Sequence, residues 1–263
     1  MVCVTQNRLF PANSSRGFLI SIVVASLFSL GILGPAGPPT AEAAPATDEE
    51  GFRFELTPYL WLSGLKGDVR IRRLGTEVDA DFKDLLDHLD LGGALVFEAG
   101  KGNWSGWFDG FYVRLKEGAE RERVSIGAVV EASIIDGAIA YRVAEGPAVD
   151  VYAGVRRSRI DVEFELKPLV TLDGHESWVD PIVGARFLWE LTDRWFAGIK
   201  FDMGGFGMGS DFTWNAQAGI GYRFTEHISL KGSYRYLSID YDEDDFVYDT
   251  DMNGFQIGLG ISW

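Results

Sequence analysis

Apolar and polar residues alternate along most of this chain. In residues 254–263 every odd position is apolar and every even position is Gly, Gln or Ser. The same period of two runs through residues 179–191, 195–203, 212–224 and 228–236. Successive side chains of a β-strand point to opposite faces, so each segment is expected to be a strand with one apolar face. The pattern predicts an all-β, antiparallel protein.

Such strands can close in one of two ways. In a soluble barrel or sandwich the apolar faces point inward, whereas in an outer-membrane barrel they face lipid and the polar faces line the lumen. The polar face here is rich in Gly, Ser and isolated charges, and short and long connections alternate. Aromatic residues gather at the expected strand ends, as at the two interfaces of a membrane barrel; they are Trp104, Tyr141, Trp189, Trp195, Phe224 and Trp263. We therefore expect a transmembrane, up-and-down β-barrel.

The turns predict the number of strands. Short turns lie at residues 101–103, 145–147, 192–194 and 225–227, and longer polar connections lie near 64–91, 116–122, 166–177, 204–210 and 240–250. With both termini on the periplasmic side, these turns and loops make about ten strands. The expected strands are 52–63, 92–100, 104–115, 123–144, 148–164, 177–191, 195–203, 211–224, 228–239 and 251–263. Eight strands, or twelve if residues 69–71 and 78–80 form a hairpin, stay open as alternatives.

Two irregularities interrupt the alternation. The phase slips near Ile134 and near residues 157–159, which predicts β-bulges or parts of the barrel that rise above the membrane. Residues 81–90 predict one short helix in the first extracellular loop, with Asp81 as its N-cap. The apolar face of this helix consists of Phe82, Leu85, Leu86 and Leu89. The helix either covers or enters the mouth of the barrel, or simply lies on the loop.

The N-terminus has the features of a secretory signal peptide. Arg8 and Arg16 precede a 16-residue apolar run, and the small-x-small site Ala41-Glu42-Ala43 follows it. The run is shorter than the roughly 20 residues that a spanning helix needs. Cleavage near Ala43 would remove Cys3. Cys3 is the single cysteine of the chain, and one cysteine cannot form a disulfide framework. The expected organisation is 1–43 signal peptide, 44–51 N-terminal linker and 52–263 outer-membrane β-barrel.

Several segments carry a family resemblance. They are residues 56–68, the helix at 82–89, 180–186, 204–211, 221–224 and 234–237, and together they extend over about 52–263. In this order they resemble a family of porin-like outer-membrane β-barrel proteins of Gram-negative bacteria. The resemblance implies the barrel fold and an outer-membrane location, and it brings no catalytic residue. The C-terminal apolar positions resemble the signal read by the barrel-insertion machinery; they are Phe255, Ile257, Leu259, Ile261 and Trp263.

Charged residues on the polar faces are expected to line the lumen. They are Arg53, Glu55, Glu98, Asp109, Glu131, Asp136, Arg142, Asp150, Arg156, Asp180, Arg186, Glu190, Lys200, Asp202, Arg223, Lys231 and Arg235. Eight are basic and nine are acidic, so the expected lumen is nearly neutral. Buried charge is costly unless it is paired, which favours an ion-paired, filled interior. A narrow, porin-like channel lined by both signs stays open as the alternative.

The net charge of −15 must then lie mostly in the loops. Acidic clusters occur at 77–90 and at 240–251, where the residues include Asp242, Glu243, Asp244 and Asp245. These clusters form either a solvated rim or sites for divalent cations bound through carboxylate oxygens. In front of an open lumen they would give a weak cation preference. An acidic chain excludes nucleic acid as a partner and leaves outer-membrane lipid and lipopolysaccharide as the expected surroundings.

Candidate catalytic residues are few. His175 and Ser177 share a face of an extended segment, and a His can activate a Ser for attack on lipid A or on surface peptides. His88 and His227 fall on a helix and on a distant turn, so no metal site is expected. We expect a non-enzymatic outer-membrane barrel without a cofactor, either structural or a narrow porin-like channel. An outer-membrane enzyme and a soluble periplasmic ligand-binding barrel are the alternatives.

The alternation makes a prediction about the location of the protein in the cell. We expect the mature chain to fractionate with the outer membrane, and we expect its gel mobility to change on boiling, because a closed barrel resists detergent until it is heated. Cell fractionation followed by electrophoresis of heated and unheated samples measures both. Release into the soluble fraction by osmotic shock would contradict the membrane assignment.

Overall fold

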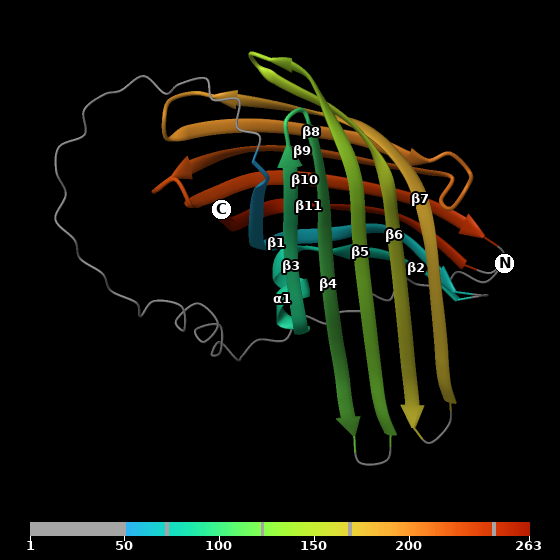
Figure 1. Cartoon of the computed structure of the whole chain (residues 1–263). Helices are drawn as coiled ribbons and strands as arrows, with labels where there is room; N and C mark the ends of the chain where they lie inside the picture. Colours follow the sequence, from blue (N-terminus) through green and yellow to red (C-terminus); the bar gives the residue numbers. More distant parts are fainter. Residues whose placement is uncertain (1–50, 72–73, 122–123, 168–169, 244–245) are drawn as a thin grey trace. The chain divides into compact units, whose positions relative to one another are not determined.

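The computed structural model describes residues 51–71, 74–121, 124–167, 170–243 and 246–263, which form a closed β-barrel with one short helix (Figure 1). The elements are β1 (Arg53–Ile71), β2 (Leu74–Ala80), α1 (Phe82–Asp87), β3 (Leu89–Lys101), β4 (Trp104–Arg121), β5 (Val124–Glu145), β6 (Ala148–Lys167), β7 (Val170–Glu190), β8 (Trp195–Gly205), β9 (Phe212–Arg223), β10 (Ile228–Glu243) and β11 (Phe246–Ser262). Within these ranges no helix is long and apolar enough to cross a membrane. The expected signal peptide, residues 44–50 of the linker, Asp244 and Asp245 lie outside the described residues.

Ten strands close the barrel, as the turn pattern predicts. The strands from β3 to β11 pair with their sequence neighbours, all antiparallel, and β1 joins the two ends of this sheet. Tyr59 of β1 lies at the seam, because it is opposite Ala94 of β3 on one side and Gly258 of β11 on the other. Figure 1 shows β4–β7 crossing β9–β11 at a steep angle, as opposite walls of a strongly sheared barrel do.

The first connection adds one strand outside the closed ring. Residues 69–71 and 78–80 are indeed part of a hairpin, because residues 65–71 of β1 pair with β2. Residues 53–59 of β1 pair with β3 instead. Helix α1 lies between β2 and β3 in the chain and contacts β1 and β2, so it lies along the loop. A capping box between Asp81 and Asp84 begins the helix. Leu89, expected in the helix, is the first residue of β3.

The walls of the barrel differ in height. The strands β4–β7 contain 18, 22, 20 and 21 residues, whereas β8 and β9 contain 11 and 12. Residues 170–181 of β7 therefore extend beyond the end of β8, which pairs with β7 only at residues 182–190. We call the end of the barrel that carries the short turns its lower end. Above the upper ends of the short strands β8 and β9, the tall wall of β4–β7 packs on β10 and β11. Trp178 stacks on Tyr241 with ring centroids 4.1 Å apart and lies against Phe246 and Tyr248.

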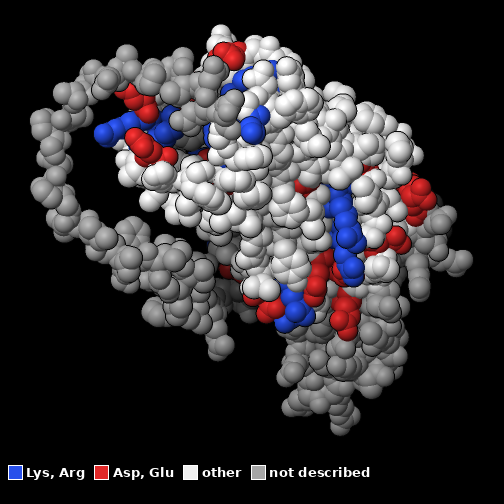
Figure 2. All heavy atoms as spheres, in the orientation of Figure 1, with Lys and Arg blue, Asp and Glu red and all other residues white. Residues whose placement is uncertain are grey.

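In the lower part of the barrel the strands expose their apolar side chains and bury their polar ones. On β11, Phe255 and Ile257 are 67% and 48% exposed, whereas the intervening Gln256 is buried. Figure 2 shows the resulting outer surface, a broad area nearly free of Lys, Arg, Asp and Glu with charges gathered toward its two ends. An apolar outer band with polar residues inside is the arrangement of a barrel that spans a membrane.

In the upper part of the barrel this polarity inverts while the period of two continues. On β6 the inward residues change from Arg156 to Ile160, and the outward ones change from Val155 to Arg159 and Asp161. The structure has no bulge near Ile134 or near residues 157–159, so of the two expectations it fits the other, a part of the barrel that rises above the membrane. Pairing of β5 with β6 is continuous there, and its register shifts only between Arg142 and Ala144. Where the apolar side chains change from the outer to the inner face, the sequence looks as if one residue had been inserted, although none has been.

Close packing of β11 on β1 leads to a prediction about Gly254. A Cβ atom at Gly254 would lie 2.1 Å from the carbonyl oxygen of Leu62 and 2.6 Å from the Cα of Ser63, both of which are backbone atoms. We expect Gly254→Ala to lower the free energy of unfolding by about 1–3 kcal/mol, because the seam must move apart. Urea titration of the refolded barrel in detergent, followed by Trp fluorescence, measures this change.

Gly232→Ala on β10 is the matched control, because nothing lies within 4 Å of a Cβ atom at that position. We expect its unfolding midpoint to equal that of the unmodified protein or to exceed it slightly. Equal loss of stability in the two variants would show that the seam is not closely packed.

Candidate functional site

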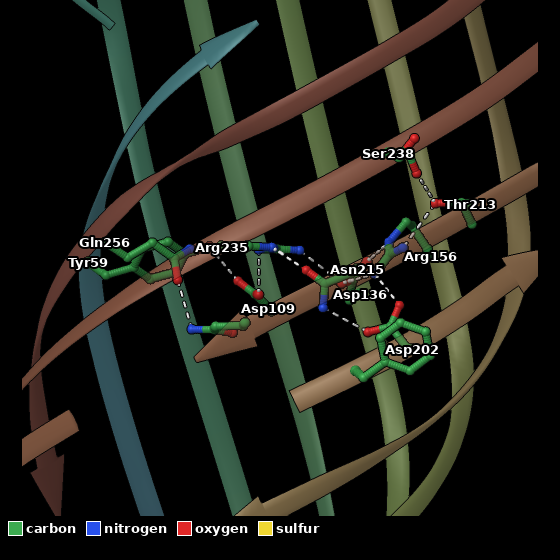
Figure 3. Close-up of polar contacts among 12 residues, drawn as sticks. Tyr59, Asp109, Asp136, Arg156, Asp202, Thr213, Asn215, Arg235, Ser238 and Gln256 are labelled. Atoms are coloured by element: carbon green, nitrogen blue, oxygen red, sulfur yellow. Dashed lines mark hydrogen bonds and ion pairs between the residues drawn. The ribbon is translucent and has the colours of Figure 1, made fainter. Parts of the chain in front are cut away.

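The polar interior of the barrel is the candidate functional site. Its side chains come from the inward positions of β1, β4, β5, β6, β8, β9 and β10, strands that lie on different sides of the lumen (Figure 3). Two arginines organise it. Arg156 and Arg235 are 0% and 2% exposed, and each contacts residues from several strands.

Arg156 on β6 joins three strands to its own. Its guanidinium donates two hydrogen bonds to the carboxylate of Asp136 on β5, at 2.8 and 3.0 Å. It donates another at 2.9 Å to Asp202 on β8 and a fourth at 3.1 Å to the hydroxyl of Thr213 on β9. The planar fork of an arginine suits this combination, because it can donate up to five hydrogen bonds in fixed directions.

Arg235 on β10 reaches across to the opposite wall. It donates hydrogen bonds to Asp109 on β4 at 3.1 Å, to Asp136 at 3.4 Å and to the side-chain oxygen of Asn215 at 2.8 Å. Its guanidinium carbon lies 4.9 Å from the ring centroid of Trp61, a cation–π contact. Asp136 therefore accepts hydrogen bonds from both arginines and links them (Figure 3).

Neutral groups complete the contacts of the carboxylates. The hydroxyl of Tyr59 donates to Asp109 at 2.7 Å, and the hydroxyl of Tyr152 donates to Asp202 at 2.9 Å. Asn215 donates its amide to Asp202 at 2.9 Å. Three carboxylates, from Asp109, Asp136 and Asp202, thus lie among three cations.

The third cation of this central network is Lys200. Its Nζ lies 3.7 Å from the ring centroid of Trp107 and 5.9 Å from that of Tyr152, so aromatic faces take the place of a direct carboxylate contact. Arg156, Arg235 and Lys200 then balance the three carboxylates. A buried set of charges that sums to zero avoids the large cost of an isolated ion in a medium of low dielectric constant.

A second ion-paired layer lies toward the end of the barrel that carries the short turns. Arg186 donates two hydrogen bonds of 2.8 Å to Glu98 on the facing strand β3, and it also contacts Asp150 at 2.8 Å. Arg142 donates to the same Asp150 at 2.8 Å. Two cations again meet two carboxylates. Nearer the end, Lys231 contacts Glu55, and Arg223 contacts Glu190.

The interior above the central network is apolar. Buried residues of β1, β5, β6, β7, β10 and β11 pack together there, and they are Tyr59, Trp61, Ile134, Ile160, Trp178, Leu237, Ile239, Tyr241, Phe246, Tyr248 and Met252. Asp180 lies at the boundary between the two regions. It accepts hydrogen bonds from Trp178 Nε1 at 3.2 Å and from the backbone N–H of Ser210 at 2.6 Å.

The structure places the expected lumen charges as follows. Inward positions are occupied by Arg53, Glu55, Glu98, Asp109, Asp136, Arg142, Asp150, Arg156, Asp180, Arg186, Glu190, Lys200, Asp202, Arg223, Lys231 and Arg235. The expectation for Glu131 is wrong, because β5 continues without a bulge from the inward Asp136 and so turns Glu131 outward. There it contacts Arg114 at 3.1 Å. The sequence reasoning did not single out the neutral partners Tyr59, Tyr152 and Asn215, although their inward phase could have indicated them.

The other candidate residues do not assemble into a site. His175 and Ser177 both lie exposed on the outer face of β7, and no hydrogen bond joins them. Among the residues that the structure describes, no group of three or more His, Cys, Asp or Glu side chains is arranged to hold a metal ion. The residues expected to form the C-terminal insertion signal lie on the outer face of β11 and its end, and their role stays a prediction.

Comparison with protein families identifies the chain. Residues 65–262 match the model of the outer membrane protein beta-barrel domain. The chain belongs to this family. Its location is therefore the outer membrane, and the alternative of a soluble periplasmic barrel is wrong. A comparison with curated protein sequences gives no match.

Solved structures give further likenesses. The attachment invasion locus protein Ail of Yersinia pestis is 11% identical, with 81% of this chain and 99% of that chain covered and a TM-score of 0.40. The outer membrane protease OmpT of Escherichia coli is 10% identical, with 82% and 99% covered and a TM-score of 0.47. The toluene transporter TodX of Pseudomonas putida is 9% identical, with 81% and 89% covered and a TM-score of 0.28.

The buried position of Arg156 predicts a large effect on stability. Arg156→Met leaves the carboxylates of Asp136 and Asp202 buried with fewer cations, so we expect the free energy of unfolding to fall by about 3–5 kcal/mol. Arg223→Met is the control, because its partner Glu190 has a side chain that is 66% exposed. An exposed pair contributes about 1 kcal/mol at most. Urea titration of both refolded variants measures the two free energies of unfolding. Equal losses of stability in the two variants would contradict the central role of Arg156.

Proposed function

We propose that this protein is a non-enzymatic, structural outer-membrane barrel whose lumen is closed to solutes. One observation carries the proposal. The buried side chain of Arg235 extends from β10 to Asp109 on β4 and also contacts Asp136 on β5, so a chain of hydrogen bonds crosses the lumen. Arg156 continues that chain to β6, β8 and β9.

Two further layers support a closed lumen. Below the central network, Arg186 joins β7 to Glu98 of β3 across the interior. Above it, the apolar cluster around Trp178 and Leu237 fills the space between the tall wall and β10–β11. A permeating ion would have to separate buried ion pairs and then pass an apolar layer, and each step is costly.

The placement of the His and Ser residues supports the non-enzymatic part of the proposal. His175 and Ser177 face outward from β7 and lie apart from the polar interior. The central carboxylates are engaged with arginines, tyrosines and Asn215. Carboxylates held in this way stabilise the barrel and have no access to a substrate.

Conductance of the refolded protein in a planar bilayer tests the proposal. We expect no conductance steps from the unmodified protein. The double variant Asp109→Ser with Arg235→Ser removes one charge of each sign and shortens both side chains, so we expect small, steady steps from a narrow opening. Glu190→Ser with Arg223→Ser removes an equivalent pair at the end of the barrel, and we expect that control to stay silent.

Steady conductance in the unmodified protein would contradict the closed lumen and favour a narrow porin-like channel. In that case the reversal potential under a KCl gradient tests the weak cation preference. The acidic loop residues would attract cations over about one Debye length, roughly 8 Å at physiological ionic strength.

A further inference from the structure

Arg157 lies on the outer face of β6, at the same height as the upper edge of the apolar band that faces lipid. On β7 the outward residues are apolar from Trp189 up to Val179. These ten steps of about 3.3 Å, tilted by about 40°, span about 25 Å, the height of the apolar band of an outer-membrane barrel. Arg157 of β6 is opposite Val179 on one side and Ile135 on the other. Its Cα thus lies at the upper boundary of the lipid-facing surface.

Among the residues that the structure describes, none provides a counter-charge for Arg157. Its side chain is exposed, and it makes no hydrogen bond or ion pair with any residue that the structure describes. Its immediate outward neighbours Val155, Val179 and Ile135 are apolar, and the first two are about half exposed. A cation on the lipid face of a barrel is destabilising in proportion to its depth. An anion supplied by the membrane would remove that cost.

The other cations nearby are held in place by carboxylates. Arg159, one step above Arg157, makes two hydrogen bonds to Asp161, at 2.7 and 3.0 Å. On β4, Arg114 contacts Glu131 at 3.1 Å and Lys116 contacts Asp90 at 2.8 Å. Glu131 lies on β5 opposite Asp161 of β6, whereas the Lys116–Asp90 pair joins β4 to β3. This sector, which we call the β4–β6 basic sector, consists of Arg114, Lys116, Arg157 and Arg159.

Three outward aspartates lie side by side on the opposite side of the barrel, where the nearby cations Lys66 and Arg70 pair with Asp79 and Asp242. Asp240 on β10 is opposite Asp249 on β11, which is opposite Asp68 on β1. A row of aspartates repels an anion. Three of the four cations in the β4–β6 basic sector pair with Asp90, Glu131 and Asp161. Among the described residues of this sector, Arg157 is therefore the cation that is left for an anionic group approaching the outer wall.

We propose that Arg157, assisted by Arg159, binds a phosphate group of an outer-leaflet lipid headgroup. A guanidinium can donate two parallel hydrogen bonds to phosphate oxygens, which gives a strong and directional contact. The outward-facing side chains of Val155, Val179 and Ile135 lie beside it, where the acyl chains of the same lipid would pack. This combination of an arginine above apolar residues fits a lipid phosphate better than a free phosphate ion. The proposal does not depend on whether the lumen conducts.

Binding of lipid A to the refolded full chain in a zwitterionic detergent, followed by native mass spectrometry, tests the site. We expect Arg157→Gln to weaken lipid A binding about tenfold, the value of one hydrogen bond to a charged group. Lys66→Gln is the matched control, because Lys66 is an exposed cation on the outer wall that pairs with Asp79 at 3.7 Å. We expect that control to bind as the unmodified protein does. Retained heat-dependent gel mobility shows that each variant is folded.

A second variant tests the role of Arg159. Asp161→Asn frees Arg159 from its carboxylate partner, so we expect lipid A to bind more tightly. Diacylglycerol, which has no phosphate group, should not distinguish Arg157→Gln from the unmodified protein, and inorganic phosphate at the same concentration should not compete with lipid A. Equal binding of lipid A to Arg157→Gln and Lys66→Gln would overturn the proposal. Full competition by inorganic phosphate would also overturn it, because the site would then recognise a free anion.

Discussion

The pairing of charges across a narrow lumen is the interaction on which this barrel depends. A strand in a bilayer must turn its apolar side chains toward lipid, because the hydrocarbon layer offers no hydrogen-bond partners. The polar side chains of ten strands then face one another in a space that side chains can fill. Inward charges are then balanced mainly by partners on other strands, and the buried contacts of Arg156 and Arg235 are the outcome.

Arginine is the residue that makes such an interior possible. Asp136 and Asp202 come from strands that are not neighbours, and the guanidinium of Arg156 contacts both because its donors point in several directions within one plane. Lys200 has a single compact charge, and it lies over the face of Trp107. Its positive charge still belongs to the balanced set. Within the same network, Arg156 thus joins carboxylates on separate strands, whereas Lys200 contributes to the balance of charge.

The sequence predicts much of this fold and less of its interior. The period of two predicts the strands and the inward phase of Asp109, Arg156 and Arg235, and the spacing of short turns and long connections predicts about ten strands. It cannot predict which of these side chains meet, because contacts such as Arg186 with Glu98 depend on the tilt and shear of the closed barrel. Neutral partners such as Tyr59 carry no charge signal and were missed for that reason.

The wrong expectations have a common physical origin. Above the membrane both faces of the wall can meet water, so the apolar face is free to turn inward and pack, as Ile160 and Trp178 do. The charged residues Glu131 and Asp161 then lie outside, where they form ion pairs with Arg114 and Arg159. If the polar face lined the lumen along the whole strand, a bulge would be needed to explain this change, whereas a barrel that rises above the membrane needs none. The alternation does not break near Ile134 or residues 157–159. The height at which its polarity inverts there corresponds to the outer surface of the membrane.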